Sequence, residues 1–159
     1  MMRNMKSIFL LFILTLTAIN IIPQAKNLET GLYLVNPPDS CSGINNKNSV
    51  IYLSETLCLN PKPVITVKDF DLCTIDSTIY GGNEIYSLDI KLKKPAAIKF
   101  KEITARNVGK KIAVIIDNKV VIAAVVRNPI TSGRMTIGGD KEENIRKLYE
   151  KLKQEMKGK

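Results

Sequence analysis

The sequence predicts a single α+β domain in which a mainly antiparallel sheet has helices packed on one face. Three observations predict this class. Residues 86–92 alternate apolar and polar side chains, the period of a strand with one buried face. Residues 94–107 and 140–157 instead carry apolar side chains at helical spacing. The chain has 159 residues, which is enough to bury one modest core.

The first half of the chain predicts short strands joined by irregular loops. Residues 31–35 and 50–53 are apolar runs bounded by Pro37-Pro38 and by Ser, Gly and Asn, so we expect them to extend the sheet. Gly81-Gly82-Asn83 predicts a turn just before the strand at 86–92, because glycine and asparagine accept positive φ angles.

The central segment predicts a helix followed by a hairpin. The helix from Lys94 to Asn107 is expected to end at Gly109 in a left-handed cap. Residues 112–116 form an apolar strand, and Asp117-Asn118-Lys119 predicts a tight turn into a second apolar strand at 120–126. Because both strands are hydrophobic, we expect them at the centre of the sheet.

The last segment predicts a short strand at Met135 to Ile137 and a final helix after Gly138-Gly139. Asp140 and Glu143 have the spacing of a capping box that would start this helix. Its apolar stripe comprises Ile145, Leu148, Tyr149, Leu152 and Met156. Lys147 and Lys151 fall on the opposite, solvent-facing side, so the outer face of the helix is expected to be positively charged.

A motif spans the predicted helix, hairpin and final strand. Its residues are Phe100, Thr104, Asn107, Gly109, Lys110, Ala113, Asp117, Ile130, Gly133, Ile137 and Gly139. In this order and approximate spacing they resemble the head subdomain in the first periplasmic domain of the SecD family. Pro63-Val-Ile-Thr66 followed by Asp69-Phe70 extends the resemblance over about residues 60 to 155. The family pattern has Ser-Ala-Pro in the second hairpin strand, where this chain has Ile122-Ala-Ala-Val125.

The resemblance implies a SecD periplasmic head-like fold and a noncatalytic exported module that contacts polypeptides in protein export or envelope biogenesis. The alternative is a structural or inhibitory envelope protein that uses the same fold on an unrelated partner, because a fold does not fix a function. An extended polypeptide could add to an exposed strand edge, a binding mode that depends on backbone hydrogen bonds.

The residue content speaks against an enzyme. The chain has no histidine, the usual general base near neutral pH, and we find no nucleophile paired with a base. Asp69, Asp71 and Asp76 are close in sequence, but they alternate with apolar residues as surface positions do. Thr104 and Asn107 are expected to bond nearby backbone. We therefore predict no catalytic residues and no cofactor; an enzyme would need a pocket with perturbed carboxylates or with Cys41.

Three cysteines, Cys41, Cys58 and Cys73, allow one disulfide and leave one thiol. We favour Cys58 with Cys73, since they flank Pro61-Lys-Pro63 and close a short loop, while Cys41 could pair with either. A metal site is not expected, because the cysteines lack a C-x-x-C pair and no histidine completes a zinc ligand set.

The first residues predict export. Arg3 and Lys6 precede an almost wholly apolar run at 8–22, the pattern of a signal peptide, so we divide the chain into a signal peptide at 1–25 and one domain at 26–159. We expect an extracytoplasmic protein, periplasmic or secreted, without a stable membrane span after processing. The alternative is an uncleaved anchor, although the run is short of the roughly 20 residues that span a bilayer.

The chain is basic, with 24 Lys and Arg against 15 Asp and Glu. This balance permits binding to acidic partners, and equally fits a solvated lysine-rich surface. Nucleic acid is not an expected partner, because the cations are spread along the chain without an arginine cluster interleaved with aromatics. A protein or polypeptide partner is expected, and the sequence leaves the oligomeric state open.

Overall fold

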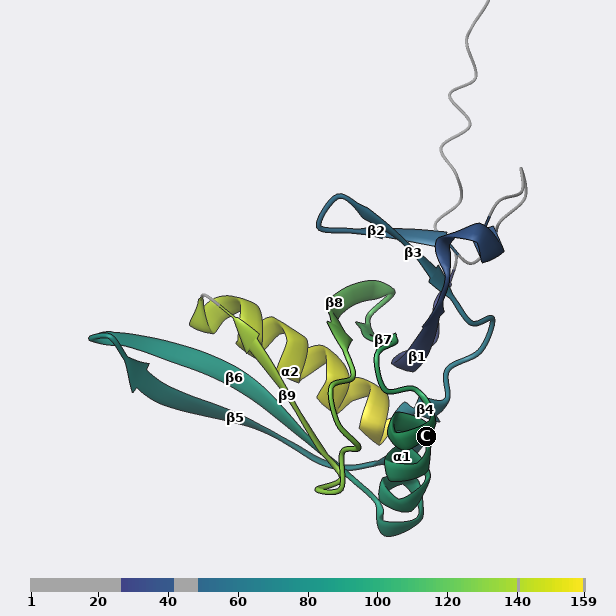
Figure 1. The fold of residues 1–159 in the computed structure, drawn as a ribbon. Helices are drawn as coiled ribbons and strands as arrows, with labels where there is room; N and C mark the ends of the chain where they lie inside the picture. Colours follow the sequence, from purple (N-terminus) through teal and green to yellow (C-terminus); the bar gives the residue numbers. More distant parts are fainter. Residues whose placement is uncertain (1–26, 42–48, 140, 159) are drawn as a thin grey trace, which may run out of the picture.

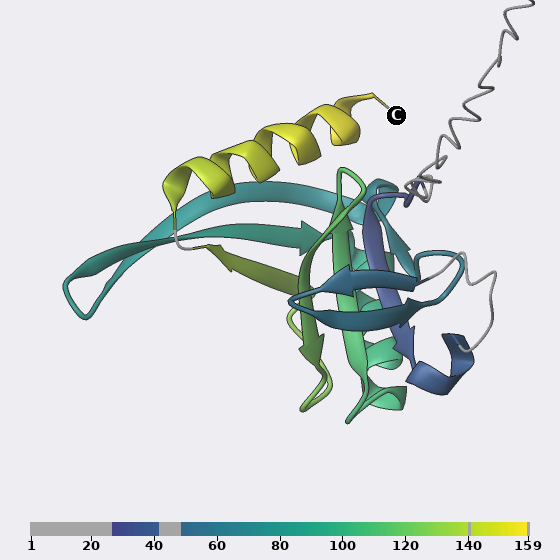
Figure 2. The same ribbon diagram turned by 90° about the horizontal axis from the view of Figure 1, so that it is seen from above.

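The computed structural model describes residues 27–41, 49–139 and 141–158. In these residues the strands form two antiparallel sheets rather than the single sheet that the sequence predicts (Figures 1 and 2). The first sheet has the order β2-β3-β1-β7-β8, with β4 paired to β1. Its strands are β1 (Gly31–Asn36), β2 (Ser49–Tyr52), β3 (Glu55–Leu59), β4 (Ile65–Thr66), β7 (Lys111–Ile116) and β8 (Lys119–Val125).

The second sheet is a long hairpin with one added strand. Its order is β5-β6-β9, and its strands are β5 (Phe70–Tyr80), β6 (Asn83–Leu92) and β9 (Arg134–Gly139). The helices and 3-10 turns are α1 (Lys94–Arg106), α2 (Glu142–Lys157), η1 (Pro38–Cys41) and η2 (Val67–Asp69). The predicted α+β class with antiparallel pairing is therefore confirmed. The division into two sheets follows from η2, after which the chain leaves β4 and starts a separate hairpin.

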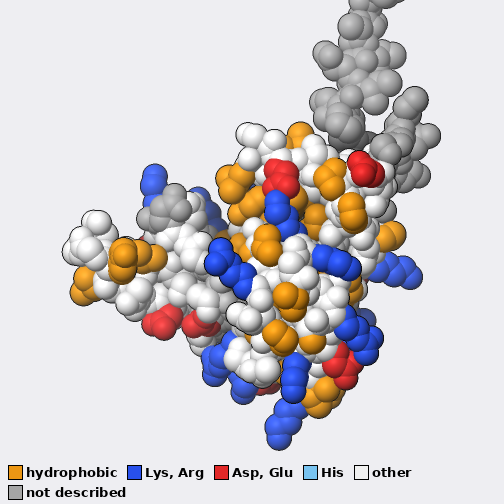
Figure 3. All heavy atoms as spheres, viewed as in Figure 1, with side chains coloured by type: hydrophobic (Ala, Val, Ile, Leu, Met, Phe, Trp, Pro, Cys, Tyr) orange, Lys and Arg blue, Asp and Glu red, His pale blue; other side chains and the backbone are white. Residues whose placement is uncertain are grey.

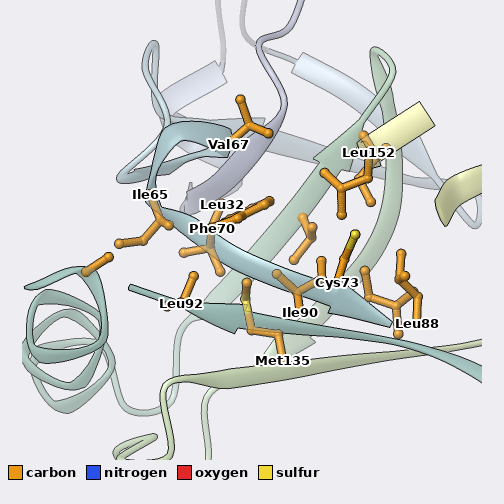
Figure 4. Packing of buried hydrophobic residues seen from close by; sticks show 14 of the residues in the cluster. Leu32, Ile65, Val67, Phe70, Cys73, Leu88, Ile90, Leu92, Met135 and Leu152 are labelled. Atoms are coloured by element: carbon orange, nitrogen blue, oxygen red, sulfur yellow. The ribbon is translucent and has the colours of Figure 1, made fainter. Parts of the chain in front are cut away.

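The main core lies where the two sheets and both helices meet (Figure 4). Phe100 of α1 and Leu152 of α2 are fully buried there, and α2 seats Ile145 against the backbone at Gly139 of β9. The sheet side chains in this cluster include Leu32, Ile65, Phe70, Cys73, Leu88, Ile90, Leu92, Val114, Ile116 and Ile137. The predicted apolar stripe of the last helix thus packs as expected, since Leu148, Tyr149 and Met156 also lie against this core.

A smaller core fills the opposite face of the first sheet, which curls so that β2 lies against β8. Its buried members are Tyr33, Leu57, Leu59, Ala113 and Ile115. Neighbouring residues such as Leu32 and Tyr33 point to the two different cores, as alternation along a strand requires. Burial on both faces explains why β7 reads as a continuous apolar run.

The predicted place of the 112–126 hairpin is only half right. β7 is central, between β1 and β8, but β8 pairs with β7 alone and is the edge strand of the order. Its side chains are mostly half-buried, and Val125 is exposed. Hydrophobic character therefore did not distinguish a central strand from an edge strand that the curled sheet shelters.

The turns form where the sequence predicts them. Asp117 and Asn118 have φ angles of 50° and 62° between β7 and β8, and Gly81 and Gly82 have φ angles of 58° and 81° between β5 and β6. Positive φ at both central residues suits a two-residue hairpin, because its twist matches that of the strands. A turn that the sequence analysis missed joins β2 to β3 through Leu53 and Ser54.

The start of the last helix differs from the prediction. The N-cap residue of α2 is Lys141, whose side chain makes no capping hydrogen bond, whereas the capping box predicted on Asp140 and Glu143 would place Asp140 at that position. Asp140 itself lies outside the described residues. A capping box occurs instead at η2, where the Asp69 carboxylate accepts from the Thr66 backbone N–H at 2.8 Å.

The favoured cysteine pairing is wrong. The disulfide joins Cys41 of η1 to Cys58 of β3, and Cys73 is a free, buried thiol. Cys58 and Cys73 are close in sequence but lie in different sheets, because the chain between them crosses from one sheet to the other. Cys73 consequently points into the main core beside α2 (Figure 4), and burial raises the pKa of its thiol.

The N-terminal predictions fall outside the described residues. The signal peptide at 1–25 belongs to the segment that the structure does not describe. Among the described residues, no helix combines the length and apolar character needed to cross a bilayer.

The exit of α1 gives the first testable prediction. Gly109 has the predicted positive φ, 83°, but α1 ends at Arg106 with Asn107 as its C-cap, and the Gly109 N–H donates to the Val126 carbonyl rather than to the helix. A Cβ at Gly109 would meet no atom within 4 Å. Because the Cβ has room, we expect Gly109→Val to act through backbone strain and to lower the free energy of unfolding by more than about 1 kcal/mol. Denaturant unfolding measures this. Gly138→Val is the control, because a Cβ there also meets no atom and its φ is ordinary; equal stability of the two variants would contradict strain at Gly109.

Candidate functional site

The edges of the two sheets are the surfaces where another backbone could bind. β2, the first edge, has only four residues, and β8 is sheltered by β2. β9 has six residues and ends at the start of α2. β5 is the longest edge strand, with eleven residues, and it contains no Lys, Arg or Pro to protect it. The open edge of β5 is therefore the candidate site.

The outer part of this edge projects beyond the helix that covers the sheet. α2 starts over β6 near Tyr86, and the hairpin continues past that point into solvent (Figures 1 and 2). Ile79 and Tyr80 are 78% and 76% exposed, and Ile85, paired with Thr78 on β6, is also exposed. Figure 3 shows hydrophobic side chains gathered at this projecting end with acidic side chains beside them. Exposed apolar groups beside unpaired backbone fit a contact surface.

Polar side chains just below the tip of the hairpin affect one another's ionisation. The hydrogen bond with Glu84 is the main cause that raises the pKa of the Tyr86 phenol to about 12, and Glu142 of α2 adds to it. The same bond, with a second from Ser77, lowers the pKa of the Glu84 carboxyl. At neutral pH the phenol is thus neutral and the carboxylate ionised, so a negative charge is held on the hairpin.

The outer face of α2 is less strongly positive than the sequence suggests. Lys147 and Lys151 are exposed as predicted, but Lys147 pairs with Glu143 at 2.6 Å and Lys151 lies 3.7 Å from Asp117. An open groove of about 680 Å³ separates this helix from the β7–β8 turn. Its rim carries as many acids as bases, because Lys119 and Arg146 are matched by Glu142 and Glu150. The balance of charges gives this groove no clear preference for a charged partner.

The buried polar residue of the family motif, Thr104, makes hydrogen bonds within the domain. Thr104 is fully buried; its Oγ1 donates to the Phe100 carbonyl at 2.8 Å and accepts from the Ile130 N–H at 2.9 Å. Asn107 donates from Nδ2 to the Ile103 carbonyl at 2.8 Å. Both bond nearby backbone, the behaviour that the sequence analysis expects of them, and Thr104 also ties the segment after β8 to α1.

The other motif residues shape connections and contacts. Gly133 has a φ angle of 61°, and a Cβ there would lie 2.6 Å from the Ala97 Cβ, so this turn packs directly on α1. Lys110 exchanges backbone hydrogen bonds at the exit of α1, accepting from the Val126 N–H at 2.9 Å. Asp117, in the β7–β8 turn, receives its nearest ion-pair partner from α2. These residues surround the main core and lie away from the β5 edge.

The carboxylates of the predicted surface cluster do not converge. Asp69 caps η2, Asp71 pairs with Lys91 at 3.1 Å, and Asp76 accepts from the Ser77 N–H at 2.8 Å. No group of three or more His, Cys, Asp or Glu side chains in the described part of the chain is placed to hold a metal ion. Cys41 is in the disulfide and so is not a thiol nucleophile.

The sequence analysis missed β5 as a strand, and with it the candidate site. The segment Thr74-Ile-Asp-Ser-Thr-Ile-Tyr80 is rich in β-branched residues and runs directly into Gly81-Gly82. That composition before a glycine turn, followed by an alternating strand, is the signal of a hairpin.

Comparison with known families places the fold. Residues 48–154 match the family model described as the P1 head subdomain of SecDF. A protein translocase subunit SecD from Acidaminococcus fermentans is 43% identical over 108 residues, covering 68% of this chain and 24% of that protein. One from Thermobaculum terrenum is 38% identical over 85 residues, covering 54% of this chain and 16% of that protein. The chain thus spans about a quarter or less of the length of these relatives.

Solved structures agree with the sequence matches. A structure of SecDF, described as a membrane component that enhances protein export, is 27% identical with a TM-score of 0.50, covering 60% of this chain and 42% of that one. A second SecDF structure, in a super-membrane-facing form, has a TM-score of 0.57 at 21% identity, covering 77% of this chain and 18% of that one, which supports the fold alone. The predicted head-like fold is therefore confirmed.

Thr104 allows a test that separates structural from functional roles in the motif. Thr104→Val keeps the shape but leaves the Ile130 N–H without its acceptor, so we expect a loss of about 1–3 kcal/mol in the free energy of unfolding. Thr136→Val is the control, since Thr136 donates to Asp89 at 2.5 Å on an exposed strand face and should cost much less. Chemical denaturation compares them. Equal, small losses would mean that the buried bonds contribute little.

Proposed function

The chain belongs to the SecDF P1 head subdomain family, and on that premise we propose that it is a noncatalytic binding module that contacts extended polypeptides in protein export or envelope biogenesis. The relatives are protein translocase subunits, and a SecDF is described as enhancing protein export. The observation that carries the proposal is the open β5 edge with exposed Ile79 and Tyr80 beside it. The module works outside the cytoplasm, after removal of residues 1–25 as a signal peptide, with residues 26–159 as one domain.

Binding at this edge uses backbone groups, which every polypeptide has. An incoming strand satisfies the outward N–H and C=O groups of β5, while Ile79 and Tyr80 gain apolar contacts. Such binding tolerates many sequences, because the ladder of hydrogen bonds does not depend on side chains. It also requires an extended client, so a folded protein without a free strand is a poor ligand.

A catalytic role lacks support in the described residues. Of the carboxyl groups there, Glu84 has its pKa lowered rather than raised, which does not suit a general acid. The free thiol of Cys73 is buried in the core with a raised pKa, so little of it is the reactive thiolate.

A single proline tests the edge. We expect Ser77→Pro to weaken binding of a fluorescently labelled, permanently unfolded protein, such as reduced carboxymethylated α-lactalbumin, by about tenfold or more, because proline removes an outward N–H. Ser77→Ala is the matched control: it loses the hydroxyl but keeps the N–H, and should bind like the natural chain. Fluorescence anisotropy gives the dissociation constants, and circular dichroism checks folding. Unchanged binding by a folded Ser77→Pro variant would refute the edge as the site.

The outer face of α2, with Lys147 and Lys151, is the alternative binding surface to the β5 edge. If an acidic partner used it, Lys147→Glu and Lys151→Glu would weaken binding in a salt-dependent way. Because the client binds through the β5 edge in our proposal, we expect both reversals to leave the dissociation constant of the unfolded client within about twofold, as is usual for exposed charges. The same anisotropy titration at low and high salt distinguishes the surfaces. A large, salt-sensitive loss would move the contact to α2.

A further inference from the structure

We propose that the β5 edge prefers extended segments in which a cationic side chain lies between apolar ones, and that Asp76 selects the cation. This rests on the proposed function and deepens it by naming the class of segment. For a strand that adds antiparallel to β5, the preferred pattern from N- to C-terminus is apolar, any, any, Lys or Arg, apolar. Three features of the hairpin lead to this pattern: the outward backbone groups, the faces of the side chains, and the local charge.

The register of the hairpin shows which backbone groups are free. Tyr80 and Asn83 flank the two-residue turn and are directly paired, so they exchange backbone hydrogen bonds. Bonding alternates along an antiparallel pair, which leaves the N–H and C=O groups of Ile75, Ser77 and Ile79 pointing away from β6. The hydrogen bond from the Ser77 N–H to the Asp76 Oδ1 agrees with this direction.

Asp76 therefore occupies the place that an incoming strand would take. Its carboxylate accepts from the outward Ser77 N–H at 2.8 Å in an exposed position. A carbonyl of an added strand can accept from that N–H instead. The exchange frees the Asp76 carboxylate at the margin of the new strand, where it needs a donor. A lysine or arginine on that strand supplies the donor and a compensating charge.

The faces of β5 fix where the cation must stand. Ile75 and Ile79 lie on the side covered by α2, across from Leu88 and Glu84, and Ile79 is largely uncovered. Asp76 lies on the opposite, wet side of the sheet. Side chains that face Ile75 and Ile79 are therefore apolar, whereas the side chain that faces Asp76 points to the wet side and is cationic.

The charge of the hairpin agrees with a cationic segment. Residues 70–92 carry the carboxylates Asp71, Asp76, Glu84 and Asp89. Their only cation is Lys91, which is paired with Asp71 at 3.1 Å, although the whole chain has a net charge of +9. The charge of Lys153 on α2 lowers the pKa of the Cys73 thiol, against the larger effect of burial, so this cation lies near β5 three residues inward from Asp76. Its ammonium group donates to the Tyr149 hydroxyl at 3.0 Å. The outer hairpin is thus a locally negative surface on a basic protein, and it favours a positively charged client.

Synthetic peptides test the preference directly. Labelled, capped peptides contain Ile-Thr-Ser-Lys-Ile between flexible Gly and Ser residues, and two partners replace the lysine with glutamine or glutamate. We expect the lysine peptide to bind about threefold to fivefold tighter than the glutamine peptide, the range of one exposed ion pair. The glutamate peptide should bind most weakly. Anisotropy titrations at low salt measure the ratios, and higher salt should narrow them.

Two matched variants locate the effect. Asp76→Asn keeps an oxygen that can cap Ser77 but removes the charge, so it should bind the lysine and glutamine peptides equally. Asp89→Asn makes the same change on β6, one strand farther from the edge, and should keep the preference. A preference that survives Asp76→Asn, or that Asp89→Asn removes, would overturn the assignment to Asp76.

The outcomes also separate this inference from the proposed function. Equal binding of all three peptides by the natural chain, lost in Ser77→Pro, would refute the cation preference and leave the edge as a binding site. Binding of no peptide and no unfolded protein by the natural chain would refute the proposed function, and the inference with it.

Discussion

The fold depends on the apolar stripe of α2, which closes a core that two separate sheets share. Ile145 and Leu152 are almost completely buried, and Ile145 packs so closely on β9 that a side chain at Gly139 would collide with it. Burial of such side chains contributes about 1.5–3 kcal/mol each, more than any surface ion pair of this molecule. α2 packs against β5, β6 and β9 of the three-stranded sheet and against β7 of the first sheet, so it helps to bury the inner faces of both. The position of α2 also decides which part of the long hairpin stays uncovered.

The two long edge strands, β8 and β5, are protected from pairing with another strand in different ways. β8 carries few charges and no proline, yet the curled first sheet brings β2 against it. β5 has no covering element past the start of α2, and its protection is a local one: the Asp76 carboxylate occupies the outward Ser77 N–H. A local hydrogen bond at an exposed position is weak and exchangeable, because water competes for both groups. The hairpin therefore avoids an unsatisfied edge while it remains open to another strand.

Much of the fold could be read from the sequence, but the site could not. The stripe from Ile145 to Met156, the positive φ of Gly109 and the Asp117-Asn118 turn depend on local spacing and backbone preference, and all appear where they were predicted. The Cys41–Cys58 pairing and the edge position of β8 depend on which strands become neighbours, which local patterns do not determine. β5 itself carries a sequence signal, because its β-branched residues run into Gly81-Gly82, but that signal does not show that its edge stays open. Whether a strand lies at an uncovered edge depends on where α2 and the other strands pack, which local patterns do not determine.

The most direct measurement is residue-resolved amide hydrogen exchange by NMR, with and without an unfolded client. If the client adds as a strand to β5, exchange slows at the amides of Ile75, Ser77 and Ile79, whose N–H groups point outward. The amides of Thr74, Asp76 and Thr78, already bonded to β6, change less. This alternating pattern is specific to strand addition. Protection that appears instead along β8 or α2, with the β5 amides unchanged, would contradict binding at the β5 edge.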